Sequence, residues 1–269
     1  MSVISLITDF GTKDEYAGVM KGVILSICPE ARIVDVTHHI PSHDVLQAAF
    51  LLQSSYMYFP AGTVHLIVVD PGVGSDRAIV AMKKGDYYFI APDNGLLSFI
   101  IEKDDVSDII SVKNSKFFLD RVGCSFHGRD IMAPVAAHLA NGVSLNSLGP
   151  PLMQDDLFRL DYKNAHFSST GKEISGIIIS VDKFGNLTTN IPVSMLSSHK
   201  REIDLKKVDI IIGNKKIKGL SNSYSDSEIH SPLAIVGSRE FLEIAVNCGN
   251  AREFFNAKRF DPVQVILLK

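Results

Sequence analysis

The chain has 269 residues, of which 46% are hydrophobic and 21% are charged, a composition that excludes disordered, collagen-like and coiled-coil proteins and allows one large or two smaller globular domains. Its 27 basic and 30 acidic residues give a formal net charge of −3, which offers no electrostatic basis for binding nucleic acid or an anionic membrane surface. The first residues lack a basic segment and no apolar run approaches the 18 residues of a membrane span, so we expect a cytoplasmic protein.

Residues 1–162 alternate between short β-branched runs and helical patterns, which predicts an N-terminal α/β domain whose sheet is covered by helices. The run Val64–Val69 is apolar on both faces, as a central strand requires. The predicted strands are Val3–Thr8, Arg32–Thr37, Val64–Val69, a hairpin of Ala78–Met82 and Tyr87–Ile90 around Lys83–Asp86, and Ile109–Val112. The predicted helices are Tyr16–Cys28, Asp44–Tyr58, Leu96–Glu102 and Arg129–Ala140. The first has Val19, Val23, Ile24 and Ile27 at helical spacing, and the second has Asp44 as its cap.

The polar stretch Asp161–Gly171 has no periodicity and marks a domain boundary. After it, residues 172–269 carry short strand patterns separated by Asn, Gly and Ser, which predicts a smaller C-terminal all-β barrel domain. The predicted strands are Ile174–Val181, Leu187–Ile191, Val208–Ile212, Ile217–Gly219, Leu233–Val236, Leu242–Val246 and Val263–Leu268.

Polar clusters stand near the ends of predicted elements, where open α/β sheets bind ligands. Thr8–Gly11 follows the first strand, Asp70–Arg77 the third and Pro92–Gly95 the hairpin, whereas Phe126–Asp130 precedes a helix. Turn chemistry alone accounts for any one cluster, because Asp, Asn, Pro and Gly favour tight turns. The short matches Asp-Phe-Gly and Gly-Val-Gly lack the other parts of a kinase or a dinucleotide-binding motif, so neither is indicated.

Three histidines, His38, His39 and His43, stand beside Asp44, and their residue types suit a metal ion. A metal-dependent hydrolase is therefore an alternative. Adjacent histidines in a strand point to opposite faces, so at most one of the first two reaches a given site. We expect loop histidines beside a helix cap, and no metal.

The cysteines Cys28, Cys124 and Cys248 are far apart and show no CxxC spacing. This pattern suggests neither a disulfide framework nor a zinc site. We expect reduced thiols that pack in the interior rather than act as nucleophiles.

Six motifs occur in a fixed order across both predicted domains: Thr8–Gly11, Val69–Gly74 followed by Arg77, Pro92–Gly95, Phe126–Asp130, Asp182–Asn186 and Glu243–Asn247. Together they resemble the S-adenosylmethionine hydroxide adenosyltransferase family, whose relatives include fluorinating and chlorinating adenosyl enzymes. The resemblance implies an N-terminal α/β domain, a C-terminal β-barrel and a homotrimer with sites between one subunit's N-terminal domain and a neighbour's C-terminal domain. It implies hydrolysis of S-adenosyl-L-methionine to adenosine and L-methionine, without a cofactor.

The family's catalytic triad matches Asp70, Arg77 and His127. The sulfonium of the substrate is already a good leaving group, so catalysis has to act on water, whose pKa is about 15.7. Asp70 and His127 would accept or orient protons while Arg77 supplies a permanent positive charge. The alternative for Asp70 is a turn residue that ends a strand, and the alternative for His127 is a loop histidine. For the whole protein, the alternative is a non-catalytic S-adenosylmethionine or nucleoside sensor, which tight binding without product would identify.

The resemblance also implies contacts to the ribose and the methionine portion. Asp9 matches the acid that holds the ribose hydroxyls, since a carboxylate accepts from two neighbouring hydroxyls. Asp14 and Asp182 match positions near the methionine ammonium, and Ser238 is a candidate for its carboxylate. The alternative for Asp9 is a turn acid after a strand, and the alternative for Asp14 and Asp182 is solvated surface charge.

The adenine contacts implied by the resemblance lie in the second half of the chain. Asn186 both donates and accepts, as an adenine edge requires, and the backbone of Asn247 and Cys248 matches the adenine-reading turn. Tyr224 is a candidate to stack on the base. Cys248 stands where the family usually has a small residue such as Gly or Ala.

Overall fold

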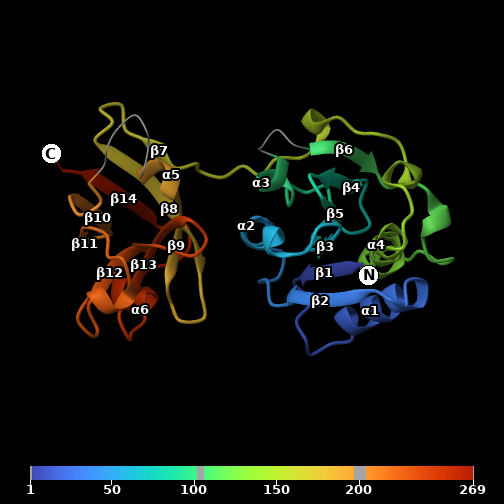
Figure 1. Ribbon diagram of the computed structural model, residues 1–269, viewed down its shortest axis with the longest axis horizontal. Helices are drawn as coiled ribbons and strands as arrows, with labels where there is room; N and C mark the ends of the chain where they lie inside the picture. Colours follow the sequence, from blue (N-terminus) through green and yellow to red (C-terminus); the bar gives the residue numbers. More distant parts are fainter. Residues whose placement is uncertain (1, 102–105, 197–203, 269) are drawn as a thin grey trace. The chain divides into compact units, whose positions relative to one another are not determined.

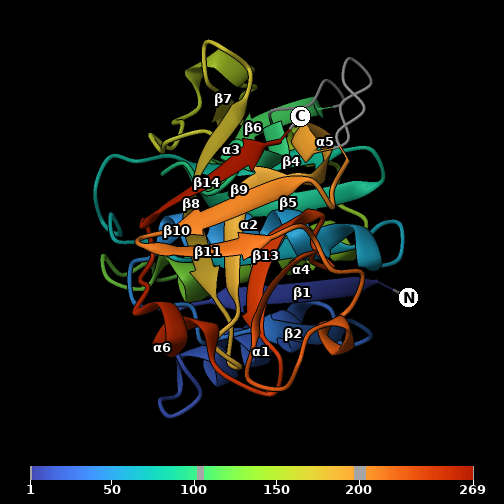
Figure 2. The same cartoon turned by 90° about the vertical axis from the view of Figure 1, so that its left-hand side faces the viewer.

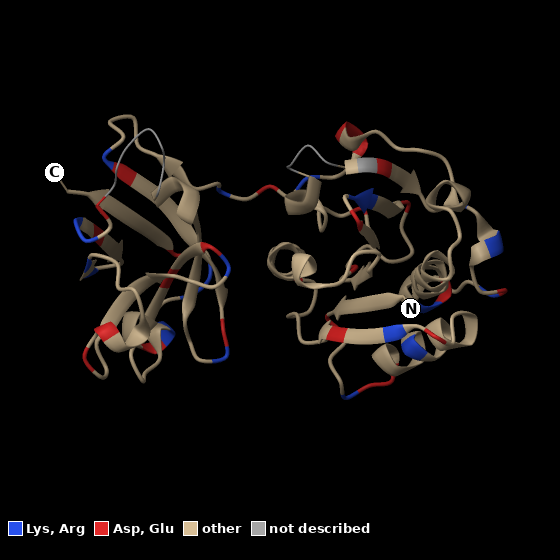
Figure 3. Cartoon of the chain, in the orientation of Figure 1, with Lys and Arg blue, Asp and Glu red and all other residues tan. Residues whose placement is uncertain are grey.

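The computed structural model describes residues 2–101, 106–196 and 204–268. The chain divides into two compact units, Met1–Leu160 and Asp161–Lys269. Each contains its own β-sheet, and the predicted mixed α/β class is confirmed (Figure 1). Basic and acidic residues are interspersed along both units, in keeping with the small net charge (Figure 3). Within the described ranges, no helix is long and apolar enough to cross a membrane.

The N-terminal unit is built on a six-stranded sheet in the order β2-β1-β3-β5-β4-β6. Its strands are β1 (Val3–Thr8), β2 (Arg32–Thr37), β3 (Val64–Val68), β4 (Ile79–Lys84), β5 (Tyr87–Pro92) and β6 (Val106–Ser111). The first four in the sheet order run parallel, and β4 is antiparallel to β5 and β6. Every residue of β3 is buried, which confirms the central strand predicted from its nearly uninterrupted apolar run.

Helices cover both faces of this sheet. Alternate residues of β3 point to opposite faces, so Leu66 packs in one core with α1 (Tyr16–Ile27) and α4 (Ala133–Ala140). Ile67 packs in the other core with α2 (Val45–Ser55) and α3 (Ser98–Ile101). Figure 1 shows α1 and α4 side by side. Short 3₁₀ turns complete the unit at Tyr56–Tyr58, Ser115–Phe117, Leu145–Leu148 and Gln154–Asp156.

Three of the four predicted helices differ from the structure by more than one residue at an end or are divided. The helix predicted to reach Tyr58 ends at Ser55 and continues as a 3₁₀ turn, two residues before Pro60; Asp44 caps its start by accepting from the Gln47 N–H, as predicted. The helix predicted from Leu96 begins at Ser98, and Glu102 lies outside the described residues. The last predicted helix divides into a π-helical turn, Gly128–Met132, and α4, whose first turn accommodates Pro134 because that residue has no N–H to donate.

The buried face of α1 also differs from the prediction. Ala17, Met20 and Ile24 are buried, whereas Val19 is 36% exposed. The helix is apolar around much of its circumference, so its sequence is compatible with more than one buried face. Packing against α4 determines that the face with Ala17, Met20 and Ile24 is buried.

The hairpin turn is shorter than predicted. Lys83 and Lys84 belong to β4, and Gly85 and Asp86 alone connect the strands, with Gly85 at a positive φ of 53°. Lys84 tolerates its buried position because its Nζ donates to the carbonyl of Ile100 at 2.6 Å.

The C-terminal unit has an eight-stranded antiparallel sheet in the order β11-β10-β14-β8-β9-β13-β12, with β7 paired to β8. Its strands are β7 (His166–Phe167), β8 (Glu173–Val181), β9 (Leu187–Pro192), β10 (Val208–Ile212), β11 (Lys215–Lys218), β12 (Pro232–Val236), β13 (Phe241–Val246) and β14 (Pro262–Leu267). The end strands β11 and β12 approach each other, so the sheet is nearly barrel-shaped. Figure 2 shows these strands, coloured yellow to red.

Several short elements of this unit were not predicted. They are β7, α5 (Val193–Leu196), the 3₁₀ turn Tyr224–Asp226 and α6 (Ala251–Phe255). Each has five residues or fewer, which is too short for a hydrophobic period to be read. β7 lies inside the polar stretch 161–171 and exists because it pairs with β8.

Interior packing is confirmed for only one cysteine. All three thiols are unpaired, but Cys28 is buried whereas Cys124 and Cys248 are exposed. The prediction was wrong for the latter two because they lie in loops, where an apolar side chain has no periodic face to join.

Candidate active site

Three side chains from two loops of the N-terminal unit, Asp70 and Arg77 from one and His127 from the other, meet beyond the carboxyl end of β3. Arg77 Nε donates to Asp70 Oδ1 at 2.9 Å, and Arg77 Nη2 donates to Asp70 Oδ2. The same Nη2 lies 3.1 Å from His127 Nδ1. The Arg77 and Asp70 side chains are only 10% and 6% exposed. The two groups thus form a two-point, largely enclosed ion pair that extends to the imidazole.

The contact with Arg77 determines which ring nitrogen of His127 carries the hydrogen. A guanidinium has only donors, so Nδ1 of His127 must accept. In the neutral imidazole the hydrogen then resides on Nε2, which is left to donate. Lys at position 77 could not reproduce this, since its ammonium is a single point charge without the planar fork.

A cavity of about 350 Å³ adjoins this cluster. This volume is within the range of small-ligand sites. Its lining residues are Asp9, Phe10, Tyr16, Ser42, His43, Val68, Asp70, Val73, Ser125, Phe126, His127 and Gly128. The cavity therefore brings together the predicted site residues Asp9, Asp70 and His127. Asp14 lies exposed in the segment before α1 and does not line the cavity.

One wall of the cavity is aromatic. The ring centroids of Phe10, Tyr16 and Phe126 lie 5.2 to 5.6 Å apart, with Phe126 edge-on to both others. Sequence reasoning did not single out these rings. Phe10 and Phe126 stand inside the recognised motifs, so they could have been considered, whereas Tyr16 is brought in only by the fold.

Asp9 is held by the loop that follows β2. Its Oδ2 accepts from the His43 N–H at 2.9 Å, and the Gly11 N–H donates to the His38 carbonyl at 2.6 Å. His43 has a φ of 66°, a left-handed conformation that is uncommon for a residue other than glycine. Such backbone strain is concentrated at functional sites.

The histidines considered as metal ligands are used in different ways. His38 is buried, with Nδ1 2.8 Å from Thr8 Oγ1 and Nε2 3.1 Å from Asp35 Oδ1, whereas His39 is exposed. Among the residues described, no three His, Cys, Asp or Glu side chains are grouped so as to hold a metal ion.

The loop that carries His127 is fixed by a buried carboxylate. Asp130, which is fully buried, accepts from the Gly123 N–H at 2.8 Å and from Arg129 Nε at 2.6 Å. Burial opposes ionisation, but these hydrogen bonds lower the pKa of Asp130 below its usual value. Gly128 allows close packing, since a Cβ there would stand 3.0 Å from Val68 Cγ1.

In the C-terminal unit, Asp182 and Asn186 close one turn between β8 and β9. Asp182 Oδ1 accepts from the Asn186 N–H at 2.8 Å, and Asp182 Oδ2 accepts from Asn186 Nδ2 at 3.0 Å. Phe184, between them, is 73% exposed. Asp182 is thus engaged with Asn186 rather than standing as a solvated charge.

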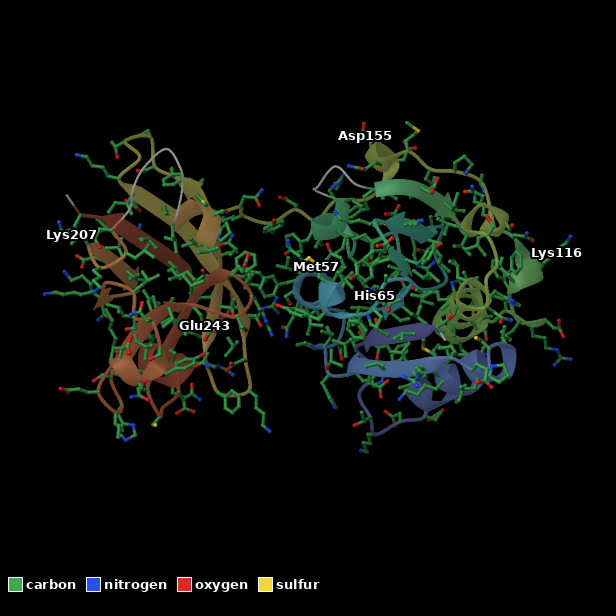
Figure 4. All side chains as sticks on the ribbon, in the orientation of Figure 1. Met57, His65, Lys116, Asp155, Lys207 and Glu243 are labelled. Carbon is green, nitrogen blue, oxygen red and sulfur yellow. The ribbon has the colours of Figure 1, made fainter. Side chains whose placement is uncertain are left out.

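Tyr224 pairs with an acid that sequence reasoning did not select for the site. Its hydroxyl donates to Glu243 Oε1 at 2.6 Å, and Figure 4 labels Glu243 on β13. Burial, the hydrogen bond to Glu243 and the charge of Asp182 raise the pKa of Tyr224. The electrostatic effect of Asp182 indicates that the 182–186 turn lies near this ring.

The remaining predicted residues lie in two turns. The Asn247 N–H donates to the Ser231 carbonyl, and the Asn247 carbonyl accepts from the His230 N–H, so this backbone is already paired. Cys248 has a φ of 52° and is exposed. Ser238 is exposed in the turn between β12 and β13.

The sequence matches two family models. Residues 4–149 match the SAM hydroxide adenosyltransferase N-terminal domain, and residues 176–264 match the C-terminal domain of the same family.

The chain is similar to curated proteins that include S-adenosyl-L-methionine hydrolases and fluorinases. The (R)-S-adenosyl-L-methionine hydrolase of Methanocaldococcus jannaschii is 32% identical over 99% of this chain and 96% of its own length. The Thermus thermophilus protein of that name is 31% identical over 99% of this chain and 100% of its own. A fluorinase of an Actinoplanes species is 29% identical over 95% and 94%. An uncharacterised conserved protein from Thermotoga maritima has a solved structure similar to this chain, with a TM-score of 0.90 and 35% identity over 99% of this chain and 100% of its own.

Proposed function

The chain belongs to the SAM hydroxide adenosyltransferase family, and we propose that it is an enzyme that hydrolyses S-adenosyl-L-methionine to adenosine and L-methionine. The observation that carries this proposal is the contact of Arg77 with both Asp70 and His127 beside one cavity. The full-length similarity to proteins named (R)-S-adenosyl-L-methionine hydrolase supports it.

The reaction is a displacement at the ribose 5′ carbon. The oxygen of water forms a bond to this carbon while the carbon–sulfur bond breaks. The electron pair of the carbon–sulfur bond moves onto sulfur. The sulfonium becomes the neutral thioether of methionine, and one proton is released to solvent in each turnover. Departure of methionine needs no acid, so the residues act on water and on alignment.

Each member of the triad has a distinct role in this proposal. Asp70 lines the cavity and retains lone pairs beyond those that accept from Arg77, so it accepts a hydrogen bond from the attacking water. Nε2–H of His127 donates to a polar group in the cavity and thereby orients it. Arg77 holds the side chains of Asp70 and His127 in fixed positions relative to each other and balances the negative charge of the Asp70 carboxylate.

Substrate contacts follow the same proposal. In the N-terminal unit, Asp9 holds the ribose hydroxyls at the cavity wall, and Asp14 acts near the methionine ammonium. In the C-terminal unit, Asp182 also serves the ammonium and Ser238 serves the carboxylate of methionine.

Adenine contacts come from the C-terminal unit in this proposal. Tyr224 stacks on the base and Asn186 reads its edge. The paired backbone of Asn247 leaves the neighbouring Cys248 as the better candidate for a backbone contact in that turn.

We also propose that the protein acts in the cytoplasm as a homotrimer, with each site shared between an N-terminal unit and a neighbouring subunit's C-terminal unit. The three unpaired cysteines are consistent with a reducing compartment. Light scattering measures the subunit number. Mixing Asp70→Asn subunits with Asn186→Ala subunits tests the shared site, because trimers that contain both would regain some active sites. Activity no higher than in the separate variants would contradict the sharing.

The reaction itself is tested in oxygen-18 water. The purified protein is incubated with S-adenosyl-L-methionine, and the adenosine is examined by mass spectrometry. We expect label in the 5′ hydroxyl of adenosine, none in methionine and one proton released per turnover. Unlabelled adenosine, another product, or binding without turnover would overturn the proposal, and the last result would identify a sensor.

A further inference from the structure

The turn Pro92–Gly95 is one of the six recognised motifs, and the proposed reaction gives it no role. It follows β5, which pairs with both β3 and β4. Asp93 and Asn94 of this turn are half-buried and do not line the cavity. Their side chains are instead engaged with backbone groups, Asn94 with the Val69 carbonyl and Asp93 with the Phe158 N–H.

This turn holds both ends of the loop that carries the ion pair. Asn94 Nδ2 donates to the carbonyl of Val69 at 2.9 Å, and Val69 directly precedes Asp70. The Asp93 N–H donates to the carbonyl of Ala78 at 2.9 Å, and Ala78 directly follows Arg77. One turn thus fixes the entry and the exit of the loop Asp70–Arg77.

The bond from Asn94 substitutes for a strand partner. The register of β1 with β3 ends at Val68, and that of β3 with β5 ends at Leu66, so the Val69 carbonyl lies beyond both ladders. Val69 is fully buried, and a buried carbonyl needs a donor. The side-chain amide of Asn94 supplies it.

The turn is itself held in place. Asn94 Oδ1 accepts from the Leu96 N–H at 3.3 Å, and Asp93 Oδ1 accepts from the Phe158 N–H at 2.9 Å. Gly95 has a φ of 93°, and a Cβ there would stand 2.8 Å from Leu160 Cγ. A turn fixed on these sides gives Asn94 a defined position from which to hold Val69.

Resting on the proposed function, we propose that Asn94 is a positioning residue, whose amide holds Val69 so that Asp70 and Arg77 meet in the geometry that the reaction requires. A displacement of about 1 Å in such a pair is enough to lower turnover by about 100-fold. Substrate affinity should change far less, since Asn94 does not reach the cavity.

The test compares three variants. Asn94→Asp retains the side-chain shape and the acceptor for Leu96 but replaces the donor to Val69 by an oxygen. Asn94→Ala removes both bonds. Asn114→Ala is the matched control, because Asn114 also accepts from the N–H two residues ahead and donates Nδ2 to a carbonyl, that of Ser147, away from the site. Unfolding midpoints identify any variant that fails to fold, and Asn94→Asp keeps the test decisive if Asn94→Ala does so.

Steady-state kinetics with S-adenosyl-L-methionine should show kcat lowered by about 10- to 100-fold in both Asn94 variants, with KM changed less than about threefold. Asn114→Ala should match the wild type. A second readout is the arginine side-chain ¹⁵N spectrum, in which the signal of the Arg77 Nε–H is assigned through Arg77→Lys. This N–H should lose its protection from exchange in Asn94→Asp and keep it in Asn114→Ala.

The two proposals fail in different ways. If the wild type does not hydrolyse the substrate but the Arg77 signal responds to Asn94→Asp, the proposed function is wrong and the positioning role stands. If the wild type is active and folded Asn94→Asp matches Asn114→Ala in kcat and in the Arg77 signal, the positioning role is wrong. A rise in KM with unchanged kcat would also contradict it.

Discussion

Gly74 lies directly against Cys124: a Cβ built on Gly74 would stand 2.5 Å from the Cys124 carbonyl oxygen. Gly74 belongs to the loop that carries Asp70 and Arg77, and Cys124 belongs to the loop that carries His127. The two loops therefore touch backbone to backbone, at a point where no side chain fits. This contact complements the hydrogen bond that joins Arg77 to His127.

Gly74→Ala should separate these loops. Gly62 provides a matched control, because its φ of 83° is nearly the same as the 82° of Gly74, but nothing lies within 4 Å of a Cβ there. Gly62→Ala should cost about 1 kcal/mol from backbone strain alone, and Gly74→Ala about 1–3 kcal/mol more from the clash. Urea unfolding measures the difference. Only Gly74→Ala should also lower kcat, and equal effects of both substitutions would contradict the importance of the contact.

Arg77→Lys retains the charge but loses the fork that joins Asp70 to His127. We expect kcat to fall by about 100-fold or more with a smaller change in KM, because the lost interactions align the reacting groups rather than bind the whole substrate. Arg32→Lys, at an exposed position of β2, is the control and should leave both constants unchanged. Near wild-type turnover in Arg77→Lys would show that charge alone suffices.

His127 can be tested with two amides. In His127→Asn the side-chain oxygen can replace the acceptor Nδ1, whereas in His127→Gln the side-chain nitrogen can replace the donor Nε2–H. If Nε2–H serves the reaction, His127→Asn should lower kcat by about tenfold or more and His127→Gln by less. The reverse order in single-turnover rates would indicate that the acceptor facing Arg77 is the important atom.

His65 predicts a pH dependence of stability separate from catalysis. His65 lies on β3 of the N-terminal unit (Figure 4). It is 1% exposed, stacks on Phe89 and lies with its Nδ1 2.6 Å from Ser5 Oγ. Burial lowers its pKa from 6.5 to about 4. Between these pH values the unfolded chain binds a proton that the folded chain does not, so stability falls as the pH drops from 6.5 to 4, by about 3 kcal/mol in total.

Replacing His65 should remove this dependence. In His65→Gln, the free energy of unfolding measured by urea at pH 7.5 and pH 5 should differ less than in the wild type. His39→Gln, at an exposed position, should retain the wild-type difference. An unchanged pH dependence in His65→Gln would mean that other groups cause it.

The sequence by itself determined the order of strands and helices in the N-terminal unit. It also determined the central place of β3, because a nearly uninterrupted apolar run indicates a strand that is buried on both faces. It also drew attention to Asp9, Asp70, Arg77 and His127, because the short motifs that hold them, taken together and in order, resemble a known family. Helix ends were less determined. The π-helical turn at Gly128–Met132 and the buried stripe of α1 depend on neighbours that are distant in sequence.

Only the tertiary structure decided which of these residues meet. Arg77 and His127 are 50 residues apart, and their contact requires the loops after β3 and before α4 to reach the same edge of the sheet. The same holds for Asn94 and Val69, whose bond replaces a strand partner where two ladders stop. Local patterns specify hydrogen bonding within an element, but the convergence of side chains depends on how packed elements place their ends, and that information is spread over the whole core.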